Sequence, residues 1–102
     1  MEFKCCSNKA REAREIEKVY RFLRLVADPN RLKIICILGN KSRCGCEITA
    51  NLGISDKLVS HHIKQLKKIN LLTEERRGNF IYYALDKKVL REYKKIFNRV
   101  IK

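Results

Sequence analysis

Two cysteines separated by one residue, Cys44 and Cys46, are the side chains of this sequence best suited to bind an ion. Thiolates select soft ions, and no cluster of Asp, Glu and His is present that would suit harder ones. Residues two apart in a regular helix point about 200° away from each other. If Cys44 precedes the helix and Gly45 allows an unusual turn, both sulfurs can meet at one ion. The pattern predicts a site for arsenite, antimonite, cadmium, lead or bismuth, with zinc less favoured.

Two thiolates rarely complete such a site, so further ligands are expected from elsewhere in the chain. Cys5 and Cys6 are the natural source, with one of them ligating and the other assisting or staying free. The alternative is that both are incidental residues of a polar leader. Cys36 lies within an apolar run and is expected to pack in the core as a small hydrophobic residue. Five cysteines without a secretory leader argue against a disulfide framework.

The segment 55–66, SDKLVSHHIKQL, has the pattern of a helix that binds nucleic acid. One helical face is apolar and the opposite face is polar and basic. The apolar face consists of Val59, Ile63, Leu66 and Ile69, and the polar face of Lys57, Ser60, His61, Lys64 and Lys68. Ser60 and His61 offer donors and acceptors for base edges or phosphates, and the flanking lysines supply charge. His62 is expected to pack against the protein.

A second basic element follows, in which Arg76, Arg77 and Asn79 stand at the tip of an expected hairpin. There they would reach phosphate or the minor groove, and the alternative is an ordinary polar hairpin tip. Asp56, at the start of the preceding helix, either accepts from a cytosine amine or sits near the positive helix end. We favour the second role, because acidic residues are common in the first turn.

The charge of the chain agrees with a polyanionic partner. Its 102 residues form one domain and carry 24 Lys and Arg against 11 Asp and Glu, a formal net charge of +13. Double-stranded DNA is the first candidate and an anionic membrane surface the second. The longest apolar run has five residues, whereas a membrane-spanning helix needs about 20. We therefore expect a soluble cytoplasmic protein.

The elements that must position these residues follow from periodicity and helix-end signals. We expect a polar leader over 1–11 and one domain over 12–102. Helices are predicted over 12–27, 29–38, 46–52, 55–70 and 86–101, and hairpin strands over 71–76 and 80–85. This order, α-α-α-α-β-β-α, is mainly α with a β-hairpin wing, a winged helix-turn-helix. The apolar stripes of the first and last helices predict a homodimer paired through them.

The chain resembles the ArsR/SmtB family of metal-responsive winged-helix repressors over about residues 26–85. Four motifs carry the resemblance: ADPNRL at 27–32, CGCEI at 44–48, VSHHI at 59–63, and ERRG at 75–78 leading to YYAL at 82–85. The family implies a homodimer that binds a palindromic operator and leaves it when a toxic metal ion binds. In its cadmium- and lead-sensing branch, N-terminal cysteines reach the Cys-x-Cys pair of the other subunit. A second family site, for zinc, nickel or cobalt, has no counterpart here.

Two alternative functions remain open at this point. One is a thiol redox or persulfide switch on the same DNA-binding frame, which Arg43 beside Cys44 favours slightly. The other is a constitutive nucleic-acid-binding module whose cysteines regulate nothing. An enzyme is not expected, since the sequence shows no nucleophile-base-acid set and no phosphate-binding loop.

Overall fold

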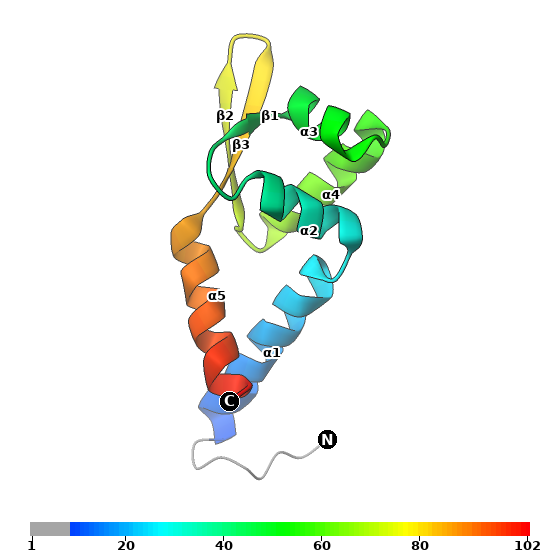
Figure 1. The fold of residues 1–102 in the computed structure, drawn as a ribbon. Helices are drawn as coiled ribbons and strands as arrows, with labels where there is room; N and C mark the ends of the chain where they lie inside the picture. The colour runs from blue at the N-terminus through cyan, green and yellow to red at the C-terminus, as the bar shows by residue number, and fades with distance from the viewer. Residues whose placement is uncertain (1–8) are drawn as a thin grey trace.

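The structure is a computed structural model that describes residues 9–102. The described chain forms a helical body with a small antiparallel sheet that projects from it (Figure 1). In chain order the elements are α1 (Lys9–Val26), α2 (Pro29–Ile37), β1 (Arg43–Cys44), α3 (Gly45–Leu52), α4 (Asp56–Lys68), β2 (Leu72–Arg77), β3 (Phe80–Leu85) and α5 (Lys87–Val100). The predicted winged helix is confirmed, and β1 is an additional strand that the sequence did not indicate.

Local signals set the starts of the helices as predicted. The carboxylate of Asp28 accepts from the backbone N–H of Arg31 at 3.2 Å, and Pro29 takes the first helical position of α2. Ser55 caps α4 by accepting from the backbone N–H of Leu58 at 3.2 Å. One start differs by more than one residue: α1 begins at Lys9 rather than at residue 12, so the last residues of the predicted leader are helical.

The sheet has the strand order β1-β3-β2, with all pairs antiparallel. β2 and β3 form the predicted hairpin, registered from Leu72 opposite Leu85 to Arg77 opposite Phe80. Its two-residue turn contains Gly78, whose φ of +62° favours glycine at this position. The hairpin runs alongside α3 and α4, and its tip extends beyond the helices as a wing (Figure 1).

The core lies between α2, α3, α4 and the base of the hairpin. Its fully buried side chains are Ile34, Leu38, Ile48, Leu66 and Leu71. The prediction that Cys36 packs here is wrong, because this side chain is exposed. A helix turns about 100° per residue, so of the apolar run in α2 only Ile34 and Leu38, four apart, are fully buried.

Helices α1 and α5 pack together and converge at the end of the molecule opposite the wing (Figure 1). The rings of Phe22 and Tyr93 stack between them with centroids 4.6 Å apart, and Arg99 of α5 pairs with Glu15 of α1. Tyr20, 53% exposed, leaves part of the α1 apolar stripe uncovered. Within residues 9–102, no helix is long and apolar enough to cross a membrane.

Candidate nucleic-acid interface and thiol site

The exposed face of α4 carries all four residues predicted there to bind DNA: Lys57, Ser60, His61 and Lys64. The opposite face is buried in the core through Val59, Ile63 and Leu66. Burial of this apolar face fixes the helix against α2 and α3. The predicted division of α4 into a packing face and a polar, basic face is confirmed.

His62 lies on the buried side of α4 and is 8% exposed, as predicted. Its Nδ1 accepts a hydrogen bond of 3.0 Å from Nε of Arg31, at the start of α2. Burial lowers the pKa of His62, which favours the neutral ring that this bond requires. Sequence reasoning missed Arg31 as the partner, because no local pattern links two residues so far apart in the chain.

The wing brings Arg76, Arg77 and Asn79 to one exposed tip. Nε of Arg76 donates to the carbonyl oxygen of Gly78 at 3.4 Å. Arg77 is held more firmly than Arg76, because its Nη2 pairs with Glu75 at 3.3 Å and its guanidinium lies over the Tyr82 ring. That ring contact was also not predicted, although an Arg and a Tyr near the base of one tight turn are a signal for it.

Asp56 is exposed in the first turn of α4, directly after the capping residue Ser55. Its carboxylate is thus placed near the positive end of the helix, where an acidic group is stabilised. The alternative role, acceptance from a cytosine amine, stays a prediction.

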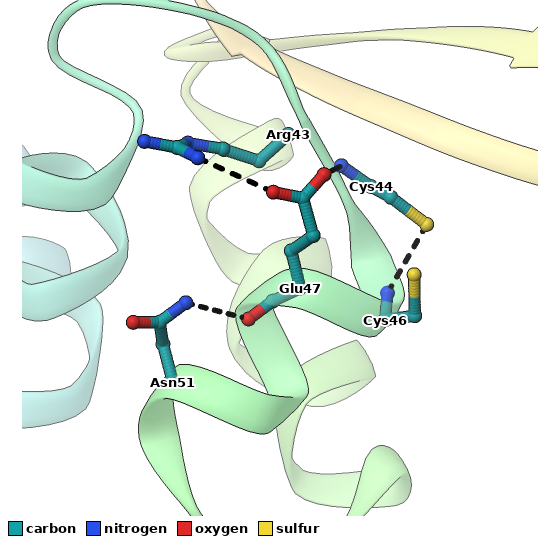
Figure 2. Close-up of polar contacts among 5 residues, drawn as sticks. All are labelled: Arg43, Cys44, Cys46, Glu47 and Asn51. Atoms are coloured by element: carbon teal, nitrogen blue, oxygen red, sulfur yellow. Dashed lines mark hydrogen bonds and ion pairs between the residues drawn. The ribbon is translucent and has the colours of Figure 1, made fainter.

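Cys44 ends β1 and serves as the N-cap of α3, so both sulfurs of the Cys-x-Cys pair stand at the start of this helix (Figure 2). Sγ of Cys44 accepts from the backbone N–H of Cys46 at 3.3 Å. Glu47 completes a capping box, since its carboxylate accepts from the backbone N–H of Cys44 at 3.3 Å. The same carboxylate pairs with Arg43 at 3.3 Å. The signal for this arrangement is a glutamate three residues after the cap.

The predicted route by which the two sulfurs come together is confirmed in one part and wrong in the other. Cys44 lies directly before the helix, as predicted, but Gly45 makes no unusual turn. Gly45 is the first residue of α3, and among residues 9–102 positive φ occurs only at Gly53, Asn70 and Gly78. The expected unusual turn at Gly45 is therefore absent. Convergence results instead from the extended backbone of Cys44, with φ −65° and ψ 146°, which turns its side chain back over the start of the helix.

The environment makes the two thiols unequal. A hydrogen bond from the Cys46 thiol, together with backbone N–H groups at the start of α3, lowers the pKa of Cys44. The same side-chain contact raises the pKa of Cys46. Cys44 is 4% exposed, whereas Cys46 is exposed. Cys44 is thus the thiol that ionises first, and Cys46 is the one that meets a reagent from solvent first.

The thiol pair fits a soft ion in part. Two adjacent sulfurs supply the donor type that arsenite, cadmium or lead prefers. Within the part of the chain that the structure describes, no group of three or more His, Cys, Asp or Glu side chains is placed to hold a metal ion. The predicted additional ligands, Cys5 and Cys6, lie outside the described residues.

The sequence is similar to several bacterial repressors. It is 29% identical to the transcriptional repressor SmtB homolog of Synechocystis sp., over 80% of this chain and 63% of that protein. It is 34% identical to the transcriptional repressor SdpR of Bacillus subtilis, over 66% of this chain and 74% of that protein. It is 32% identical to the arsenical resistance operon repressor of Staphylococcus xylosus, over 67% of this chain and 65% of that protein. The match thus spans slightly less than two thirds of the SmtB homolog and the arsenical repressor.

The fold is similar to that of known regulators. The crystal structure of the transcriptional regulator HlyU from Vibrio vulnificus superposes with a TM-score of 0.71, with 26% sequence identity, over 87% of this chain and 94% of that one. Residues 28–74 match the model of the bacterial regulatory proteins of the arsR family. These residues contain α2, α3 and α4, and with them the Cys-x-Cys pair and the basic face described above. The chain belongs to the ArsR family, whose members are DNA-binding transcriptional regulators and not enzymes.

Proposed function

We propose that this protein is a transcriptional repressor that binds a palindromic operator as a homodimer and leaves it when a thiophilic ion binds to its cysteine thiolates. The observation that carries the proposal is the position of the thiol pair. Cys44 and Cys46 stand at the start of α3, the helix that immediately precedes the basic helix α4. An ion at this point is therefore bound next to the element that would contact DNA.

For the DNA contact, α4 and the wing form the proposed surface. Exposed Lys57, Ser60, His61 and Lys64 would enter the major groove, and Arg76, Arg77 and Asn79 would reach phosphates or the minor groove. The formal net charge of +13 favours association with a polyanion.

For the homodimer, α1 and α5 form the proposed interface. These helices contact each other within the chain and still leave Tyr20 and Leu23 of α1 exposed, at 53% and 38%. A second copy related by a two-fold axis would cover these apolar side chains and place two copies of α4 on successive major grooves.

For the inducer, arsenite, cadmium or lead is proposed, with antimonite and bismuth in the same chemical class. Two sulfurs favour such soft ions, and one relative is named as an arsenical resistance operon repressor. Cys5 and Cys6 are proposed as further ligands. A coupling free energy of about 1 to 3 kcal/mol between ion and operator would lower operator affinity roughly 5- to 150-fold.

A second candidate is a thiol redox or persulfide switch on the same fold. It is favoured by one observation, the contact between an exposed thiol, Cys46, and a thiol of lowered pKa, Cys44. The two functions share the DNA-binding surface and differ in the agent that releases the operator.

The DNA-binding part can be tested with the reduced protein and a random-sequence DNA library. Selection should enrich inverted half-sites whose centres lie about 10 base pairs, or a multiple of one turn, apart. Light scattering of the free protein should give the mass of a dimer. Enrichment of no motif, with equal affinity for scrambled DNA, would support the constitutive nucleic-acid-binding module instead.

A further inference from the structure

Tyr82 occupies the central strand of the sheet, between the thiol site and the wing arginines. On one side it is registered opposite Cys44 of β1, and on the other side opposite Glu75 of β2. One row across the three strands therefore runs from the N-cap of α3 to the wing. The connection is made by backbone pairing, and it does not need the two side chains of Cys44 and Tyr82 to touch.

The ring of Tyr82 also makes a cation–π contact with an arginine of the wing. The guanidinium carbon of Arg77 lies 4.4 Å from the centroid of this ring. Glu75, on the neighbouring strand, pairs with the same guanidinium at 3.3 Å and raises the pKa of Arg77. Arg77 is nevertheless 52% exposed, and Glu75 pairs with its Nη2, so other N–H donors in the plane of the guanidinium remain for a phosphate.

We propose that Tyr82 is a positioning residue that presents Arg77 to DNA, and that the state of the Cys44 and Cys46 thiols reaches Arg77 through the pairing of β1 with β3. This inference rests on the proposed function, because it assumes that the wing contacts DNA and that the thiols bind the inducer. It adds a second route of coupling to the direct contact of α3 with α4, since β1 belongs to the same sheet as the wing.

The physical basis is the flexibility of arginine. An arginine side chain loses rotamer freedom when it binds a phosphate, and an aromatic platform removes part of that freedom in advance. Arg76 has a hydrogen bond to Gly78 within its own turn. It therefore offers a control position, an arginine of the same wing whose side chain is held by the turn instead of the ring.

The first test is a double-mutant cycle on a selected operator. Replacing Tyr82 by Leu should weaken binding about two- to fivefold, the range expected for an exposed cation–π contact. Tyr82→Phe keeps the ring and should bind like the wild type. In an Arg77→Ala background the Tyr82→Leu change should have no further effect, whereas in an Arg76→Ala background its effect should persist. Equal effects in both backgrounds would overturn the positioning role.

The second test does not depend on DNA. The ring should shift the NMR signals of the Arg77 side chain in the wild type and in Tyr82→Phe, and this shift should be lost in Tyr82→Leu. Addition of cadmium or arsenite to the reduced protein should change the shift in the wild type and leave it unchanged in Cys44→Ser. If the thiols bind the ion but the NMR shift of the Arg77 side chain stays the same, the link to the thiol site is overturned.

The two tests separate the inference from the proposed function. If the wild type is released from its operator by the ion and the Tyr82→Leu variant is released by the same factor, the repressor function stands and the Tyr82 route is rejected. If the wild type binds no operator, or the ion never binds, both are rejected. Circular dichroism and thermal unfolding of each variant establish that the sheet is intact.

Discussion

Arg31 of α2 and His62 of α4 are joined by a hydrogen bond of 3.0 Å, with Nε of Arg31 donating to Nδ1 of His62. The same guanidinium donates to the carbonyl oxygen of Leu25, near the end of α1, at 3.1 Å. One arginine thus ties the helix proposed to read DNA to the helix proposed to form the dimer. The bond requires a neutral histidine, because a protonated ring has no acceptor.

The stability of the protein should therefore fall in mild acid. Burial, the largest cause, depresses the pKa of His62 below 6.5, so between the folded and unfolded pKa values the unfolded chain binds more protons. The free energy of unfolding should be highest above about pH 6.5 and decrease as the pH falls below it.

Urea unfolding of the wild type and of His62→Gln between pH 5 and 8 would measure this effect. Glutamine cannot titrate, and its amide oxygen can still accept from Arg31. The free energy of unfolding of the wild type minus that of His62→Gln should decrease as the pH falls below about 6.5, because only the wild type loses stability through this group. The pKa of Asp28, lowered chiefly by the backbone N–H of Arg31, affects stability in a more acidic range, below its ordinary value of 3.8 and outside the pH range of this experiment. If the free energies of unfolding of the two proteins change with pH in parallel, His62 does not contribute to the pH dependence of stability.

Replacement of Cys44 should separate helix capping from ion binding. Serine is a preferred N-cap, so Cys44→Ser should keep the stability of the wild type, whereas Cys44→Ala should lose about 1 kcal/mol. Both variants should lose affinity for arsenite or cadmium, measured by competition with a chromophoric thiol chelator. Cys36→Ser is a matched control, since this exposed cysteine lies on α2 and forms no three-ligand group with the pair among the described residues. Equal ion affinity in Cys44→Ser and the wild type would remove Cys44 from the ligand set.

The wing arginines should contribute to the salt dependence of DNA binding. If Arg76 and Arg77 each neutralise one phosphate, the double alanine variant should reduce the slope of log affinity against log salt by about 2. Binding should weaken for operator and scrambled DNA alike, because phosphate contacts carry no sequence information. Fluorescence anisotropy at several salt concentrations gives the slope. An unchanged slope would remove the wing from the contact surface.

Gly45 should tolerate alanine. The Cβ of an alanine at this position would lie 3.4 Å from Cε2 of Tyr83, an ordinary van der Waals contact, and the backbone there is helical. Thermal unfolding of Gly45→Ala should match or exceed that of the wild type, because alanine is the better helix former. A large loss of stability would mean that glycine is needed at the thiol site after all.

The sequence was most informative where structure is determined locally. Apolar spacing and the capping residues Asp28 and Ser55 predicted the first and last residues of α2 and α4 to within two positions of those observed. Both signals act within one or two helical turns. Strand β1 was missed because its two residues form a strand only by pairing with β3, about 40 residues later.

The same distinction explains the errors at the thiols. Cys36 was assigned to the core from the apolar run around it, yet a helix cannot bury five consecutive residues on one side. The position of Cys44 directly before the helix was predicted, but the unusual turn was predicted at Gly45, whereas the extended backbone of the N-cap Cys44 brings the sulfurs together. The partner of His62 depends on tertiary packing, which no local pattern contains. The contact of Arg77 with Tyr82 depends on the register of one hairpin, and the tight turn between these two residues was a signal that the prediction did not use.

The central claim is that the Cys44 and Cys46 pair controls release from DNA. It is tested most directly by fluorescence anisotropy of the reduced protein on its selected operator, titrated without oxygen with arsenite, cadmium and lead. The wild type should be released at stoichiometric amounts of at least one of these ions, while Cys44→Ser should bind the operator equally well and stay bound. Release of Cys44→Ser by the same ion would contradict the claim. Release of the wild type only by an oxidant or a persulfide would assign the protein to the thiol switch instead.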